Sequence, residues 1–498
     1  MNNLENEALK SNFQYWKNEN ENDNKDILLY ETFYATPQHC YGISKVALCA
    51  AKVLNLKPAV ILPWKGSKMS KSMCGLSFQM KDKLMVLLIK HCFLLLRCFG
   101  VNNKKKLLGM SHKGINIGTY IYDSLLRSHC IPTITEISFS YRLRICSEML
   151  YFLYFERILS KYPVKIVIIG DNVYRYGLLF ELCKQRNIEC VSPVDLNSMF
   201  MLHYRNLDDF KHSYVNKNIV DLVCNHINYE DILTQYYNNR YCGNLEQHDV
   251  LSAYSGKHVT EKDKFVEKYS LDSTKNTVVI MSHVFADAPH VYASIYDDYW
   301  EWFINTLKCL RQNKNINVLV KEHPSAYLYN EKGVIKKYLK DIGADYLLID
   351  DNESTVSVLK SADVVVTCGG TIGLEFSSIG KPVVLASQPP YSELGFTHDF
   401  YDRKKYEEFL MGEIHTVKRL SEEQILMARK VSYLFFVQLN KRKENLEIGD
   451  EVIYLGHKYN NDSLFNSILK YNNIPLREQE VYKLIRDFIN SSERFLLI

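Results

Sequence analysis

Short apolar runs alternate with longer amphipathic stretches along most of the chain, a pattern typical of an α/β protein. The first half predicts strands at residues 26–30, 58–62, 105–110, 164–171 and 188–191, and helices at residues 43–54, 139–161 and 178–186. The loop at 31–42, which follows the first strand, is long and contains Glu31 and His39. Because ligands of open α/β sheets bind beyond the carboxyl ends of strands, this loop is either a binding segment or a purely structural connection.

The second half repeats the alternation in shorter units. It predicts strands at residues 277–283, 316–321, 346–349, 364–366 and 383–386, and helices at 298–313, 354–361 and 372–379. Five short strands separated by helices predict a doubly wound parallel sheet. After the strand at 364–366, Gly369 and Gly370 predict a tight turn, and Thr371 predicts the N-cap of the next helix. The free N–H groups at such a helix start can hold an anion such as a phosphate.

The length of 498 residues exceeds that of one ordinary core, so two domains are expected. The predicted fold class is α/β, with two Rossmann-like domains facing a cleft, a helical connector and a helical C-terminus. The predicted divisions are a disordered or loosely helical lead at 1–25, a first Rossmann-like domain at 26–205, a helical connector at 206–275, a second Rossmann-like domain at 276–420, and C-terminal helices at 421–498 that pack back on the first domain.

Composition narrows the class of protein. A net charge of +4 is small for this length and does not indicate nucleic-acid binding. Thirteen dispersed cysteines without a Cys-x-x-Cys pair indicate reduced, buried thiols rather than disulfides or a zinc site. The polar, Asn- and Glu-rich start of the chain does not resemble a secretion signal. We therefore expect a cytoplasmic protein.

Residues 84–96 form the most apolar stretch of the chain, interrupted by Lys90 and His91. The stretch is shorter than the roughly 20 residues that a spanning helix needs, so membrane crossing is not expected. Two alternatives stay open. The stretch is either a buried helix or, because lysines and an arginine flank it, an interfacial helix on anionic lipid, which would make the protein peripheral to the inner membrane.

Candidate phosphate-binding residues lie at strand ends in the second half. His323 precedes Pro324, whose missing N–H ends the strand, and strand alternation puts Lys321 on the same face as His323. Both side chains can interact with the negative charge of a phosphate group. Glu375 lies one turn inside the helix after the glycine turn, where it interacts either with a ligand hydroxyl or only with the helix dipole.

A second polar group follows the strand at 277–283. Ser282 and His283 are expected to contact the substrate that donates a transferred group. His290, like His39 in the first half, is expected to contact the substrate that accepts it. Asp287, Glu31 and Asp171 are three candidates for a general base, and the sequence does not choose among them. A metal site is not favoured, because this group offers no further clear ligand and the chain has no Asp-x-Asp motif.

Lys321-x-His323-Pro324, then Gly369-Gly370-Thr371-x-Gly373-x-Glu375, then Gly380-Lys381-Pro382-Val383 resembles the C-terminal half of GT-B glycosyltransferases. The resemblance covers about residues 277–385 and is greatest to the bacterial capsule and surface-polysaccharide group, which includes Kdo- and sialic-acid-type transferases with a His-Pro motif. It implies a metal-independent enzyme without a cofactor. It also implies a nucleotide-sugar donor, possibly a CMP-activated acid sugar, bound in the second domain with Glu375 at the donor, and a glycan or lipid-linked acceptor held by the first domain.

Three other functions stay open. A CDP-polyol phosphotransferase of the teichoic-acid type shares the Lys-x-His-Pro motif and a related turn. A UDP-N-acetylglucosamine 2-epimerase-like isomerase has a similar glycine turn before an acidic helix. A non-catalytic assembly protein that kept the fold is the last alternative. The products distinguish them, because the expected outcomes are a glycosidic bond, a phosphodiester, an epimer or none.

Overall fold

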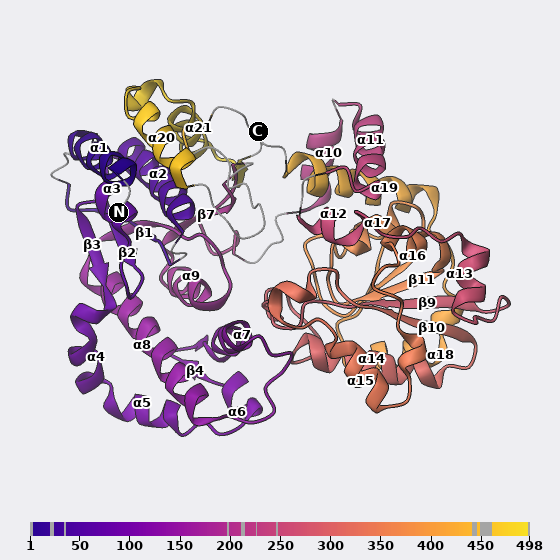
Figure 1. The fold of residues 1–498 in the computed structure, drawn as a ribbon. Coiled ribbons are helices and arrows are strands. Elements are labelled where there is room, and N and C mark those ends of the chain that lie inside the picture. Colours follow the sequence, from indigo (N-terminus) through magenta and orange to yellow (C-terminus); the bar gives the residue numbers. More distant parts are fainter. Residues whose placement is uncertain are drawn as a thin grey trace. The chain divides into compact units, whose positions relative to one another are not determined.

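A computed structural model describes residues 3–19, 24–33, 36–196, 199–210, 215–225, 227–245, 248–440, 446–448 and 461–496. The chain divides into two compact units (Figure 1). Unit 1 contains residues 1–121, 136–214 and 439–498, and unit 2 contains residues 122–135 and 215–438. Each unit has its own sheet, parallel in unit 2 and mainly parallel in unit 1, with helices on both faces, so the α/β class is confirmed.

Unit 1 is built on a seven-stranded sheet with the order β14-β8-β7-β6-β1-β2-β3. Its strands are β1 (Ile27–Glu31), β2 (Lys57–Leu62), β3 (Leu76–Gln79), β6 (Val164–Ile168), β7 (Glu189–Asp195), β8 (Phe200–Tyr204) and β14 (Phe495–Leu496). The five strands from β3 to β7 in this order are parallel, whereas β8 and β14 add an antiparallel edge. A separate short hairpin joins β4 (Ser111–His112) to β5 (Ile115–Asn116).

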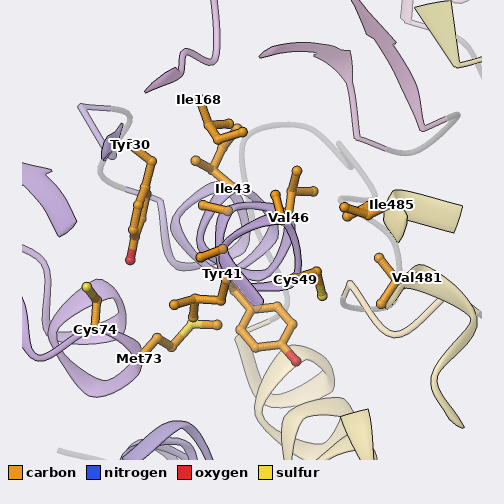
Figure 2. Packing of buried hydrophobic residues seen from close by; sticks show 14 of the residues in the cluster. Tyr30, Tyr41, Ile43, Val46, Cys49, Met73, Cys74, Ile168, Val481 and Ile485 are labelled. Atoms are coloured by element: carbon orange, nitrogen blue, oxygen red, sulfur yellow. The ribbon is translucent and has the colours of Figure 1, made fainter. Parts of the chain in front are cut away.

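The helices of unit 1 come from all three of its stretches of chain. They are α1 (Asn3–Glu19), α2 (Pro37–Leu54), α3 (Lys68–Met73), α4 (Leu84–Lys90), α5 (Cys92–Phe99), α6 (Lys104–Leu108), α8 (Phe139–Lys161), α9 (Tyr174–Arg186), α20 (Asn461–Tyr471) and α21 (Glu480–Asn490). Helix α7 (Gly118–His129) contains the boundary between the two units. Helix α20 packs on α1, and α21 packs on α2. Figure 2 shows the α2 side chains between Met73 on one side and Val481 and Ile485 of α21 on the other.

Three predictions for unit 1 are wrong. The lead is neither disordered nor loosely helical, because α1 buries Ala8 and Trp16 in the core. Residues 105–110 are not a strand: Asn103 accepts a hydrogen bond from the Lys106 N–H (2.9 Å) and caps α6, which buries Leu107. Residues 84–96 are not a buried helix. They form α4 and α5, which each bury one face and expose the other.

Lys45 in α2 is an unusual member of the unit 1 core. Its side chain is fully buried, and Nζ has no hydrogen-bond partner among the described residues. The rings of Tyr15, Trp16 and Tyr41 surround Nζ, with centroids 5.3–5.9 Å away. Burial lowers the pKa of Lys45 to about 8. A desolvated cation–π contact returns about 2 kcal/mol or somewhat more, which is less than the cost of burying an ammonium group without a hydrogen bond, so the buried ammonium is expected to destabilise unit 1.

Lys45→Met is therefore expected to raise the free energy of unfolding by about 1–3 kcal/mol at pH 7, since methionine keeps the length without the charge. The unfolded chain binds this proton up to its ordinary pKa near 10.5, so wild-type stability should rise with pH between about 8 and 10.5. The variant should lack that rise. Thermal unfolding at pH 7 and pH 10 measures both effects, and exposed Lys10→Met is the control. Equal melting temperatures for Lys45→Met and wild type at pH 7 would contradict the expectation.

Unit 2 is built on a five-stranded parallel sheet with the order β10-β9-β11-β12-β13. The strands are β9 (Asn276–Met281), β10 (Ile316–Lys321), β11 (Val364–Thr367), β12 (Val383–Leu385) and β13 (His398–Asp399). The helices are α10 (Lys217–Cys224), α11 (Tyr229–Tyr241), α12 (His248–Ala253), α13 (Lys262–Lys268), α14 (Tyr299–Gln312), α15 (Val334–Asp341), α16 (Thr355–Ser361), α17 (Ile372–Ser377), α18 (Arg403–Gly412) and α19 (Glu422–Ser432).

Two predictions for this part of the chain need correction. Residues 346–349 are not a strand: Asp345–Leu347 form a 3₁₀ turn, and Leu348 makes only one bridge, to Val320. Tyr346 is 67% exposed there, unlike a central strand residue. The second difference concerns residues 421–498, because α19 belongs to unit 2 and only the chain from 439 onward belongs to unit 1. No helix in the described part of the chain is long and apolar enough to cross a membrane.

Candidate functional site

The carboxyl edge of the unit 2 sheet brings three predicted residues together. β9 lies between β10 and β11, so the segments that follow these strands are neighbours. Ser282, after β9, accepts a hydrogen bond at Oγ from the backbone N–H of His323, after β10 (2.8 Å). The Ser325 N–H donates to His323 Nδ1 (3.1 Å). Because Nδ1 accepts, the ring proton lies on Nε2, and His323 is a hydrogen-bond donor there.

His283 holds the glycine turn that follows β11. Its Nε2 accepts hydrogen bonds from the Gly369 N–H (3.0 Å) and from the hydroxyl of Thr367 (3.3 Å). The ring stacks on Tyr299, with centroids 4.4 Å apart. Burial, with a smaller contribution from His323, lowers the pKa of His283 to about 3, so the imidazole is neutral. His283 therefore positions the turn through Nε2, and its own proton lies on Nδ1.

The first position of the glycine turn, Gly369, has no room for a side chain. A Cβ on Gly369 would lie 2.7 Å from Ser387 Oγ, which donates to the Cys368 carbonyl (2.6 Å). The Tyr391 hydroxyl donates to the Gly370 carbonyl (2.6 Å). These bonds fix the turn, and Thr371 after it is exposed. Thr371 is the N-cap residue of α17, as predicted, but its side chain makes no capping hydrogen bond.

Lys321 does not reach this edge of the sheet. Its side chain is buried, and Nζ donates to the carbonyls of Asp350 (2.9 Å) and Glu353 (2.8 Å). Burial lowers the pKa of Lys321 to about 8. The strand ends at Lys321, so the alternation that put its side chain beside that of His323 does not continue to residue 323. Lys321 therefore ties the end of β10 to the 350–353 loop, and the prediction that its side chain lies beside that of His323 is wrong.

Glu375 also points into the interior. It pairs with Arg240 of α11 (Oε1–Nη2, 3.0 Å) and accepts a hydrogen bond from the hydroxyl of Tyr254. Glu375 and Arg240 are 1% and 4% exposed. Neither predicted role, a ligand contact or a helix-dipole partner alone, describes this arrangement. The carboxylate fastens α11 and the chain at Tyr254 to α17, and so supports the glycine turn from behind.

The polar group after β9 separates into two pairs. Asp287 is exposed and accepts a hydrogen bond from the Tyr329 hydroxyl (3.0 Å). His290 Nδ1 lies 2.6 Å from Oδ1 of Asp123, which is buried in unit 2 and also accepts from the His290 N–H (3.3 Å). Sequence reasoning missed Asp123, because it lies 167 residues from His290 in a stretch without a motif. A carboxylate on Nδ1 makes Nε2 of His290 the proton acceptor, as in general-base dyads.

Unit 1 brings together the remaining predicted residues. Glu31, at the end of β1, is fully buried and accepts hydrogen bonds from the N–H groups of Phe33 (2.8 Å) and Gly170 (2.9 Å). A Cβ on Gly170 would lie 3.0 Å from Glu31 Oε1 and 3.4 Å from His39 Nε2, so glycine at this position leaves room for the two side chains. Burial raises the pKa of Glu31 to about 7, with a smaller contribution from exposed Asp171, and burial lowers that of His39 to about 4. A carboxyl group with this pKa can exchange a proton near neutral pH.

The unit 2 site thus consists of a neutral histidine, a second histidine with its proton on Nε2, and a rigid glycine turn at the carboxyl edge of a parallel sheet. Residues 208–433, which include this site, match the profile of a family described as capsule polysaccharide biosynthesis protein. No curated protein matches the chain in sequence.

Several solved structures are similar to the chain at low identity. The β-Kdo 2,4 transferase KpsC of Thermosulfurimonas dismutans is 11% identical over 54% of this chain and 79% of that chain, with a TM-score of 0.29. UDP-GlcNAc 2-epimerase of Neisseria meningitidis is 9% identical over 82% and 98% of the two chains, with a TM-score of 0.24. The wall teichoic acid polymerase TagF is 9% identical over 97% and 95%, with a TM-score of 0.23. Scores this low assign no activity.

Proposed function

We propose that the protein is a glycosyltransferase in the synthesis of a bacterial surface polysaccharide, with a nucleotide-sugar donor at the carboxyl edge of the unit 2 sheet. The observation that carries this proposal is that His323 and the glycine turn are both hydrogen-bonded to the segment after β9, through Ser282 and His283, within the part of the chain that matches the capsule family. Phosphate groups are suited to such an edge, where backbone N–H groups and a neutral donor imidazole converge.

The proposed reaction divides the chemistry between two kinds of residue. A base removes the proton from an acceptor hydroxyl, the acceptor oxygen bonds to the anomeric carbon, and the bond from that carbon to the donor phosphate breaks. His323 Nε2–H and the amides after Gly370 stabilise the charge on the leaving phosphate. Glu31, whose pKa burial raises to about 7, is one candidate for the base, as are Asp287 and Asp171. The His290–Asp123 pair is a further candidate.

The proposed identities of the donor and the acceptor follow the sequence resemblance. The His-Pro motif favours a CMP-activated acid sugar as donor, with a glycan or lipid-linked glycan as acceptor. A polyol phosphotransferase would use the same His323 contact but form a phosphodiester, and an epimerase would need no acceptor. Product analysis distinguishes these alternatives.

A panel of CMP, CDP, UDP and GDP should identify the donor class by thermal unfolding. The correct nucleotide at about 100 times its Kd adds roughly 2.7 kcal/mol to the stability of unit 2.

His323→Ala should weaken binding of that nucleotide by about 10–100-fold, because a hydrogen bond to a charged group contributes about 1.5–3 kcal/mol. His129→Ala, an exposed histidine of the same unit, is the matched control. Equal nucleotide shifts in both variants would remove His323 from the site.

A further inference from the structure

Helices α4 and α5 form an exposed apolar surface on unit 1. Leu87, Leu95 and Cys98 face the interior, and both helices pack against α8. The outward side chains are unusually exposed for their size: Phe93 is 81% exposed, Ile89 72%, and Met85 and Leu96 each 66%. In a protein whose other large apolar residues are mostly buried, this concentration of exposed apolar side chains on two consecutive helices marks an interaction site.

The charged residues in and next to α4 and α5 are almost all basic. Between residues 81 and 106 the chain has Lys81, Lys83, Lys90, Arg97 and the three lysines at 104–106, against the single acidic residue Asp82. This segment alone carries a net charge of +6, although the net charge of the whole chain is only +4. The positive charge is therefore concentrated beside the apolar surface.

A cationic cavity of about 600 Å³ adjoins the same helices. Its lining includes Lys90 and His91, at the junction of α4 and α5, and the basic residues Lys113, Arg157, Lys161 and Arg186. Glu156 is the single acidic residue in the lining, and it lies 2.5 Å from Lys113 Nζ and 3.8 Å from Arg186 Nη2. One carboxylate cannot balance five lysine and arginine side chains, so the cavity attracts an anionic group.

We propose that the α4–α5 surface docks on a bilayer of anionic phospholipid, with the exposed apolar side chains among the acyl chains and a lipid phosphate in the cationic cavity. An amphipathic surface with cations at its border is suited to the membrane interface, where apolar groups and phosphates lie within a few ångströms of one another. A second copy of this chain is a poor occupant, because a symmetric contact would bring the same cations against each other. This inference does not depend on the proposed transferase activity.

The test is sedimentation of the full chain with vesicles. The chain should bind vesicles of equal parts phosphatidylglycerol and phosphatidylcholine, and bind phosphatidylcholine vesicles much less. Each cation near the surface contributes roughly a fivefold factor, so Lys104→Gln with Lys105→Gln and Lys106→Gln should weaken binding about 100-fold. The matched control replaces Lys336, Lys337 and Lys340 of α15, three exposed lysines in unit 2, by glutamine and should bind as wild type.

A second variant tests the apolar contribution. Ile89→Ser with Phe93→Ser should weaken binding to anionic vesicles by at least about tenfold even at low salt, where the lysines are fully effective. Both side chains are mostly exposed, so the fold should be unchanged, and circular dichroism checks this. Binding that is equal in wild type and in both variants would overturn the proposal. So would loss of a dimer by Phe93→Ser in a chain that binds no vesicle, since the surface would then hold a second copy.

Discussion

Glu31→Gln is expected to slow the proposed glycosyl transfer by about 10²–10⁴-fold, the range that a positioned general base contributes. Wild-type turnover should rise with pH through about 7, because Glu31 accepts a proton only when it is ionised and burial raises its pKa to that value. The Gln variant should keep a low rate that does not change across this pH range. The measurement is nucleotide release from the donor that stabilises unit 2, followed between pH 5.5 and 8.5 on the full chain.

Two controls make this result specific. Glutamine offers one oxygen to the two N–H donors of Phe33 and Gly170, so a small loss of stability is expected and a melting curve measures it. His290→Gln tests another base candidate. If His290 is the base, Glu31→Gln retains the rise in rate near its original pH, and His290→Gln loses it. That pattern would refute the role of Glu31 and leave the donor-site assignment intact.

Arg240→Met is expected to destabilise unit 2 by about 3–5 kcal/mol, because it leaves the Glu375 carboxylate buried without its cation. For a unit of this size the melting temperature should fall by about 10 °C. Glu375→Gln should also be destabilising, since Arg240 then lacks its ionic partner. The double variant should cost less than the sum of the two single variants, because each removes the same interaction.

Lys404→Met is the matched control for this ion pair. Lys404 pairs with Glu408 on α18 in the same unit, but the two side chains are 84% and 59% exposed, so a change below about 0.5 kcal/mol is expected. Nucleotide binding distinguishes the structural role of Glu375 from the predicted ligand role. A Glu375→Gln protein with normal stability and no nucleotide shift would show that the carboxylate contacts the donor.

The strands around the site could be predicted because each is specified by its own local run of apolar residues. The runs at β9, β10, β11 and β12 are β-branched and buried on both faces, and the predicted bounds differ from the observed ones by two residues at most. The predicted strand at 346–349 failed because an apolar run of this length also suits a turn that rests on a neighbouring strand. The glycine turn was likewise predicted from local residues, Gly369 and Gly370.

Partners of the site residues could not be predicted, because they lie far away in the sequence. Glu375 has its cation 135 residues earlier, at Arg240, and His290 has its carboxylate 167 residues earlier, at Asp123. Local spacing placed Glu375 on the correct turn of α17 but could not show which way its carboxylate points. For Lys321, spacing predicted a ligand contact, whereas two carbonyls of the 350–353 loop receive its hydrogen bonds.

The division of unit 1 into separate stretches of chain affects the order of events during synthesis. Residues 215–438 of unit 2 leave the ribosome before α20 and α21, which cover α1 and α2. Synthesis of unit 1 therefore begins before that of unit 2 and ends after it. While unit 2 folds, the apolar face of α1 and α2 is not yet covered and is accessible to chaperones. A pause in translation after Gln438 has left the ribosome, and before α20 and α21 have done so, would leave a nascent chain with a completed unit 2 and an unfinished unit 1.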